Sequence, residues 1–228
     1  MLRMSKMKTI LFIRGWASTE YSFRKLIQSK PPDWDLILVG ADEIIQDNNI
    51  EKAVNTLDSF IRQQDLKSSF ILAGHSLGGA LAIAYAAKYS QKIKKLYLIN
   101  TVGAPLTGTF EKESIKMIWR NSKKLLKQIK TKIYEGINLL LKPVFHIKLG
   151  KFARGLDLLN EAAKIRVPTY ILYGDEDQLV SRSITEQIFQ KIPKANLILL
   201  KAHDHDWIQT DPDLFWNIIN KSSVDKGF

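Results

Sequence analysis

Short apolar runs rich in branched side chains alternate with segments of helical periodicity along most of this chain. Six of these runs are expected to be buried strands: residues 8–13, 36–39, 69–73, 95–100, 168–173 and 196–200. The intervening helices are expected at residues 50–64, 77–89, 183–191 and 211–220. Because strands and helices alternate with short connections, the pattern predicts a mostly parallel sheet of about six strands covered by helices on both faces.

Composition favours a soluble globular protein. Hydrophobic residues make up 45% and charged residues 25% of the 228 residues, which suits one domain and argues against disorder. The absence of cysteine excludes disulfides and thiolate sites. The longest apolar candidate for a membrane span, residues 137–149, is interrupted by lysines and a proline. The apolar stretch at 9–13 is too short for the core of a signal peptide, so a cytoplasmic protein is expected.

Reactive groups in such a sheet lie at the carboxyl ends of the strands. The third expected strand is followed by residues 74–79, which read Gly-His-Ser-Leu-Gly-Gly and lead into an alanine-rich helix. This is the G-x-S-x-G pattern in the strand–turn–helix setting of a nucleophile elbow, where small residues let neighbouring backbones approach. Ser76 is therefore the candidate nucleophile. The alternative is an ordinary glycine-rich turn capped by a serine.

A serine nucleophile needs a base and a residue that orients the base, in the chain order serine, acid, histidine. Asp175, Glu176 and Asp177 all follow the fifth expected strand. Asp177 is favoured because it stands two residues before the apolar pair at 179–180. Asp175 is expected to cap the turn, and Glu176 to be solvated.

His203 and His205 follow the last expected strand and compete for the role of base. His205 is favoured because Trp207, Ile208, Pro212 and Phe215 follow it and would anchor the final helix. His75, inside the elbow, is expected to pack beside the site.

Acyl transfer also requires donors to the oxyanion, commonly two backbone N–H groups. We expect one from Leu77, directly after the nucleophile, and one from the loop at 14–17, with Trp16 favoured. No motif for a metal ion, a nucleotide or another cofactor accompanies these residues, so none is expected.

Together these residues resemble the α/β-hydrolase superfamily of serine hydrolases, and over about three quarters of the chain they are similar to the small carboxylesterases of the biotin pathway that cleave pimeloyl-ACP methyl ester. The matching features are Gly15-Trp16 with Phe23, the elbow, residues 177–180, and the tail His205-x-x-Ile208-x-x-x-Pro212-x-x-Phe215. The resemblance implies the α/β-hydrolase fold and a catalytic triad of Ser76, Asp177 and His205.

The sequence departs from the family pattern in two respects. Arg14 precedes Gly15 where the family usually has histidine, which is expected to affect the oxyanion hole and substrate preference. The chain also starts at the family's third strand, which again implies six strands.

The resemblance further implies a helical cap at residues 102–167, inserted into a core formed by 1–101 and 168–228. Residues 110–166 hold 14 lysines and arginines against five acidic residues, so most of the chain's net charge of +11 lies there. Apolar residues at three- and four-residue steps from 115 to 141 predict an amphipathic helix with a basic opposite face. That face is either solvated or binds an acidic acyl carrier protein or an anionic membrane surface. Nucleic acid is not expected, because no base-reading motif is present.

The expected function is hydrolysis of a small-molecule carboxylic ester or thioester, including a carrier-linked acyl group, through an acyl-enzyme on Ser76. Two alternatives stay open: a lysophospholipase or monoacylglycerol-type lipase at a membrane surface, and a non-catalytic ligand-binding relative. A monomer or a dimer is expected. If the cap steers substrate, charge reversal at Lys123, Lys124, Lys127 and Lys130 should raise KM.

Overall fold

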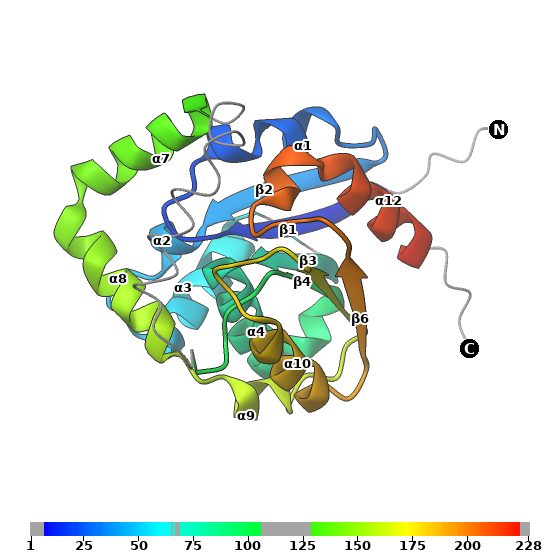
Figure 1. Cartoon of the computed structure of the whole chain (residues 1–228). Helices are drawn as coiled ribbons and strands as arrows, with labels where there is room; N and C mark the ends of the chain where they lie inside the picture. Colours follow the sequence, from blue (N-terminus) through cyan, green and yellow to red (C-terminus); the bar gives the residue numbers. More distant parts are fainter. Residues whose placement is uncertain (1–6, 65, 67–68, 106–128, 224–228) are drawn as a thin grey trace.

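A computed structural model of the chain describes residues 7–64, 66, 69–105 and 129–223. Its centre is a six-stranded sheet in the order β2-β1-β3-β4-β5-β6, in which every neighbouring pair is parallel (Figure 1). The strands are β1 (Lys8–Arg14), β2 (Trp34–Gly40), β3 (Phe70–His75), β4 (Ile93–Ile99), β5 (Thr169–Gly174) and β6 (Ala195–Leu200). The sheet predicted from the apolar runs is confirmed.

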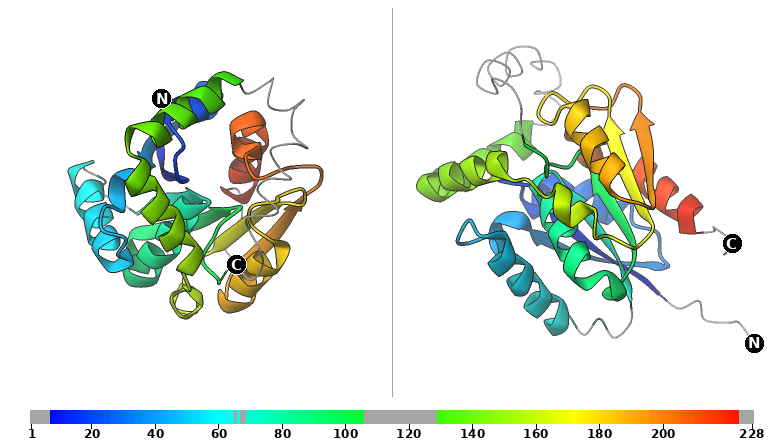
Figure 2. Two further views of the ribbon diagram at one scale, coloured as in Figure 1. Left: turned by 60° about the vertical axis from the view of Figure 1, so that its left-hand side comes forward. Right: turned by 90° about the horizontal axis from the view of Figure 1, so that it is seen from below.

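Helices cover both faces of the sheet (Figures 1 and 2). The longer ones are α3 (Ile50–Gln63), α4 (Leu77–Tyr89), α7 (Ile129–Leu141), α8 (Pro143–Gly155), α10 (Arg182–Lys191) and α12 (Pro212–Ser223). The shorter ones are η1 (Glu20–Phe23), α1 (Arg24–Gln28), α2 (Ala41–Ile44), η2 (Ser90–Lys92), α9 (Leu159–Ala162) and α11 (Trp207–Thr210).

Alternate residues of each strand contribute to two apolar cores, because successive side chains point to opposite faces. Leu11 and Ile13 of β1 pack with α3, α4 and α10, whereas Ile10 and Phe12 pack with α1, α11 and α12. Both faces are therefore buried, which explains why the strands read as continuous apolar runs.

Of the expected cap region at 102–167, the structure describes residues 102–105 and 129–167. Helix α7 ends at Leu141, where the predicted amphipathic pattern ends, and Pro143 begins α8, consistent with proline's preference for the first turn of a helix. The earlier part of the predicted helix, with Lys123, Lys124 and Lys127, lies outside the described residues. Among the described helices, none is both long and apolar enough to span a bilayer.

Candidate active site

Ser76 stands at the tight turn between β3 and α4. Its backbone has φ 53° and ψ −119°, a strained conformation for a residue with a side chain. A Cβ on Gly74 would lie 2.4 Å from the carbonyl oxygen of Gly78, and one on Gly78 would lie 2.2 Å from that of Ile13. Both glycines are thus required by close backbone contact. The Ser76 side chain does not cap α4 in the described structure, so the alternative reading as a capping serine does not hold.

Asp177 and His205 are buried and in direct contact. The Nδ1 atom of His205 lies 2.8 Å from Asp177 Oδ2. The other carboxylate oxygen, Oδ1, accepts hydrogen bonds from the backbone N–H groups of Leu179 (2.8 Å) and Val180 (3.0 Å). These two donors fix the position of the Asp177 side chain against the turn that contains the apolar pair at 179–180.

The competing residues have other partners. The carboxylate of Asp175 accepts a hydrogen bond from the backbone of Ala202 (2.7 Å) and closes the turn, and Glu176 is exposed. His203 is partly exposed, and its ring contacts the Lys201 carbonyl (2.8 Å) and the Asp211 carboxylate (3.3 Å).

Asn100 belongs to this site and was not predicted from the sequence. Its side-chain amide donates to Asp177 Oδ2, and its Oδ1 accepts from Trp207 Nε1 (2.8 Å) and the Gly174 N–H (3.4 Å). It is fully buried and has a positive φ of 43°. The available signal was a polar residue at the carboxyl end of an expected strand.

His75 connects the elbow to the histidine loop. Its ring packs against His205 with the centroids 4.8 Å apart, and its Nε2 lies 2.9 Å from the His205 carbonyl oxygen. Burial lowers the pKa of His75 to about 4, so the ring is neutral at physiological pH and its Nε2–H donates to that carbonyl. Through this hydrogen bond, His75 fixes the backbone of His205 relative to the turn that holds Ser76.

His205 is influenced by charges on both sides of its ring. Burial lowers its pKa, but the Asp177 carboxylate and then Asp206 raise it, and the net direction is upward from 6.5. Lys132 of α7 opposes this rise. The imidazolium form is thus stabilised, as a base that accepts a proton during a reaction requires.

The loop after β1 lies against the elbow. A Cβ on Gly15 would be 3.1 Å from Ser76 Cβ, so the backbone at Gly15, directly before Trp16, lies beside Ser76. The Trp16 indole N–H donates to His146 Nδ1 (3.0 Å), so this side chain is bound to α8. Leu77 is the first residue of α4, and N–H groups at that position have no partner within the helix.

Arg14 supports this loop from within the core. Its buried guanidinium donates to the Ser18 carbonyl (2.6 Å) and forms an ion pair with Glu43 of α2. The Ser18 hydroxyl in turn donates to the Gly15 carbonyl (2.7 Å). The unusual arginine thus fixes the loop on which Trp16 lies.

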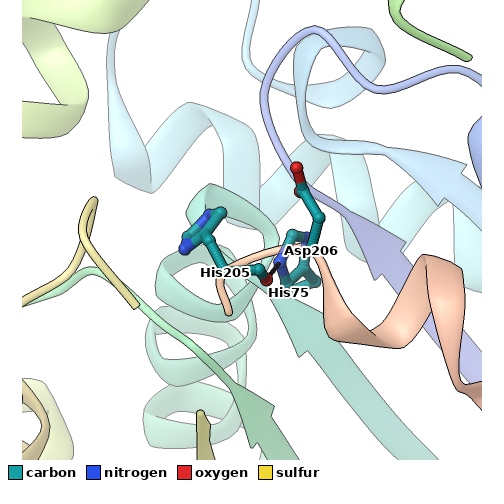
Figure 3. A group of neighbouring side chains, drawn as sticks. All are labelled: His75, His205 and Asp206. Atoms are coloured by element: carbon teal, nitrogen blue, oxygen red, sulfur yellow. Dashed lines mark hydrogen bonds between the residues drawn. The ribbon is translucent and has the colours of Figure 1, made fainter. Parts of the chain in front are cut away.

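His75, His205 and Asp206 form a cluster whose potential ligand atoms all lie within 4.8 Å of one another (Figure 3). The Asp206 carboxylate accepts from Lys132 Nζ (3.0 Å), and His75 Nε2 is hydrogen bonded to the backbone. The side chains of His205 and Asp206 also point in different directions (Figure 3). The ammonium group of Lys132 already neutralises the Asp206 carboxylate, and His75 Nε2 is already hydrogen bonded. The cluster therefore does not fit a metal site well.

Comparison with known proteins places this geometry in a family. A family model described as the alpha/beta hydrolase fold matches residues 8–122, which is half of the chain. The chain belongs to the α/β-hydrolase family. This match covers β1 to β4 and the elbow, and it agrees with the parallel sheet.

Several α/β-hydrolase relatives bear the names of lipases. Lipase 3 of Moraxella sp. (strain TA144) is 26% identical, with 86% of this chain and 71% of the relative covered. Human monoacylglycerol lipase ABHD6 is 22% identical, with 90% and 72% covered. None of these named relatives is a biotin-pathway carboxylesterase, so the narrower resemblance stays a prediction.

Solved structures show the same fold. A bacterial membrane phospholipase A superposes with a TM-score of 0.76 at 17% identity, covering 96% of this chain and 80% of that protein. The enol-lactonase of Burkholderia xenovorans LB400 gives a TM-score of 0.78 at 14% identity, covering 96% and 92%.

In this α/β hydrolase, α7 is bound to the loops of the site. Lys132 pairs with Glu135 (2.8 Å) as well as with Asp206, and Glu135 accepts from the Ser22 hydroxyl (2.9 Å). A cavity of about 640 Å³ lies between this part of the core and the two helices. Its lining includes Arg14, Ser18 and Asp42 of the core and Tyr134, Asn138 and His146 of α7 and α8. The cavity therefore borders the loop that carries Trp16.

Proposed function

We propose that this chain is a serine hydrolase that cleaves carboxylic esters of acyl chains through an acyl-enzyme on Ser76. The observation that carries the proposal is the buried Asp177–His205 hydrogen bond, linked through His75 to a strained serine elbow. The names of the lipase relatives support hydrolysis of an ester.

In the proposed mechanism, His205 Nε2 accepts the proton of Ser76 Oγ while that oxygen attacks the acyl carbon. The negative charge on the carbonyl oxygen is stabilised by the backbone N–H groups of Leu77 and Trp16. The imidazolium, stabilised by Asp177, then protonates the departing alcohol. A water molecule, deprotonated by His205, hydrolyses the acyl-enzyme and releases the acid.

Two classes of substrate follow from this chemistry. A carrier-linked or other soluble acyl ester is one. A monoacylglycerol or lysophospholipid is the other, and it is favoured by the lipase names of the relatives and by large apolar side chains exposed on α7 and α8. Initial rates on monoacylglycerol, lysophosphatidylcholine, an acyl-ACP methyl ester and p-nitrophenyl esters of increasing length distinguish them.

The proposed roles are tested by kinetics of matched variants. Ser76→Ala should lower kcat by about 10⁴-fold or more, and Asp177→Asn by about 10⁴-fold, because each removes a member of one catalytic unit. Ser76→Ala should leave Tm unchanged. Full turnover by a folded Ser76→Ala protein would overturn the proposal, whereas absence of turnover by the parent protein on all of these esters would favour a ligand-binding relative.

A further inference from the structure

Helices α7 and α8 carry a set of large apolar side chains that are exposed. We call this the cap face, and its members are Ile129, Ile133, Tyr134, Ile137, Leu140, Leu141, Val144 and Ile147. Each is close to half exposed or more, and exposure is greatest at the junction of the helices, with 79% for Leu140, 74% for Leu141 and 64% for Val144. A soluble protein rarely leaves so many large apolar side chains of two consecutive helices exposed to water, so the cap face indicates a binding surface.

The apolar residues at the junction of α7 and α8 are the most exposed of the cap face and are best placed to enter an apolar environment. Pro143 starts α8 directly after α7 ends, so Leu140, Leu141 and Val144 lie around one corner. Figure 2 shows the two helices at the periphery of the molecule, beyond the helices that pack on the sheet. Both helices are too short to cross a bilayer, so insertion at this corner would be confined to its surface.

The charges around the cap face are positive. Residues 129–155 hold six lysines and arginines and one acidic residue, Glu135. Glu135 is already paired with Lys132 and accepts from Ser22. The exposed lysines of this stretch are Lys130, Lys142, Lys148 and Lys151.

We propose that the cap face docks this protein on the surface of an anionic lipid bilayer. Apolar side chains at the corner would enter the boundary between headgroups and acyl chains, while the lysines contact lipid phosphates. A second copy of the chain is disfavoured as the occupant because it would place like charges opposite one another. An acidic carrier protein would satisfy the lysines but not the apolar corner.

Docking would also orient the site toward its substrate, and this part rests on the proposed function. The cavity of about 640 Å³ is lined by Ile137 and Leu141 of the cap face and by Arg14 of the core. A lipid-borne ester could thus pass from the bilayer surface toward the loop beside Ser76 without crossing bulk water.

The test measures binding without turnover, using the full chain with Ser76→Ala. Co-sedimentation is compared for vesicles of phosphatidylcholine alone and vesicles that also contain phosphatidylserine. We expect binding to the mixed vesicles, weaker binding to phosphatidylcholine, and release by salt because exposed charges are screened. Absence of binding to mixed vesicles would overturn the proposal.

Two sets of variants locate the surface. Leu140→Ser/Leu141→Ser/Val144→Ser and Lys142→Glu/Lys148→Glu/Lys151→Glu should each weaken binding about tenfold or more. The matched controls are Ile27→Ser/Leu199→Ser and Lys191→Glu/Lys194→Glu, exposed residues outside α7 and α8, which should bind like the parent. Equal losses in the controls would contradict the proposed surface.

A second readout separates this proposal from the proposed function. With Ser76 intact, two variants at residues that do not line the cavity of about 640 Å³, Leu140→Ser/Val144→Ser and Lys148→Glu/Lys151→Glu, should retain hydrolysis of a soluble p-nitrophenyl ester and lose hydrolysis of esters in anionic vesicles. If no ester is cleaved but vesicle binding persists, the proposed function fails and docking stands. If the variants lose binding to an acyl carrier protein and not to vesicles, docking on lipid is wrong.

Discussion

His205 is surrounded by charges of opposite sign, and in the proposed mechanism these set the pH range in which it can act as a base. Asp177 and Asp206 favour its protonated form, whereas burial and Lys132 of α7 disfavour it. Because a base must be neutral before it accepts a proton, kcat/KM should fall as pH drops through the raised pKa of His205.

Two single substitutions should move this acidic limb in opposite directions. Asp206→Asn removes a neighbouring negative charge, so the pKa of His205 should fall and the limb should move to lower pH. Lys132→Met removes a positive charge and leaves Asp206 unpaired, so the limb should move to higher pH. The measurement is the pH profile of kcat/KM on a soluble ester. The control Lys130→Met, on the exposed side of α7, should leave the profile unchanged, and shifts of the same sign for both variants would contradict this model.

The sequence alone predicts much of the candidate site at the scale of residues. Chain order and the flanking apolar pair select Asp177 over Asp175 and Glu176, and the structure brings Asp177 to His205. Asn100 could not be predicted because its three contacts come from β5, α11 and the turn at Asp177, which are brought together only by folding. The catalytic roles themselves stay predictions.

The elbow depends on contacts between backbones of three elements. A Cβ at position 78 would lie 2.2 Å from the Ile13 carbonyl of β1, and neither backbone can move without disturbing the sheet. By contrast, a Cβ on Gly136 of α7 would have nothing within 4 Å.

Gly78→Ala and Gly136→Ala should therefore have opposite effects. Gly78→Ala should lower the free energy of unfolding by about 1–3 kcal/mol or more, because overpacking forces the backbone to shift. Gly136→Ala should not lower it, because alanine is favoured over glycine within a helix by about 1 kcal/mol. Urea denaturation measures both. Equal stability of the two variants would show that the elbow tolerates a side chain at position 78.

Element boundaries were predictable where periodicity extends over enough residues. The strands lie within a few residues of their predicted positions, and α7 ends where the amphipathic pattern ends. Helix α8 was not predicted because Pro143, Lys148 and Lys151 interrupt its apolar pattern. Helices of four or five residues, such as α2 and α11, are too short to show a period.

On the scale of the whole molecule, the buried carboxylate of Asp58 connects helices α3, α4 and η2. Asp58 of α3 is fully buried and accepts from Tyr85 of α4 (2.9 Å), Arg62 Nε (2.9 Å) and Lys92 of η2. Burial raises its pKa, but hydrogen bonds from Lys92, Tyr85 and Arg62 outweigh this effect, and the net pKa lies below 3.8.

This network should make the fold sensitive to acid. A depressed pKa contributes stability that is fully present above the unfolded value of 3.8 and is lost as pH falls through the folded value. Asp58→Asn should lower stability at neutral pH and reduce the loss below pH 3.8, as measured by urea unfolding across pH. Asp47→Asn is the control, since its ion pair with Lys52 is exposed and should contribute little. A parent-like acid profile in Asp58→Asn would exclude this role.

The alternation of strands and helices was enough to predict the fold of the whole molecule, because both faces of a parallel sheet must be covered. The partner of the basic region was not predictable, since lysines alone do not distinguish a carrier protein from a membrane. The exposure of Leu140 and Leu141, which only the three-dimensional structure shows, is the observation behind the proposed docking on a bilayer.

Covalent labelling tests the central claim, that Ser76 is the nucleophile, most directly. The folded protein is treated with a fluorophosphonate probe, and the adduct is located by intact mass and peptide mapping. We predict one adduct, on Ser76, that is absent from Ser76→Ala and forms much more slowly in His205→Ala. Failure of the folded protein to react, or equal labelling of Ser76→Ala, would contradict the claim.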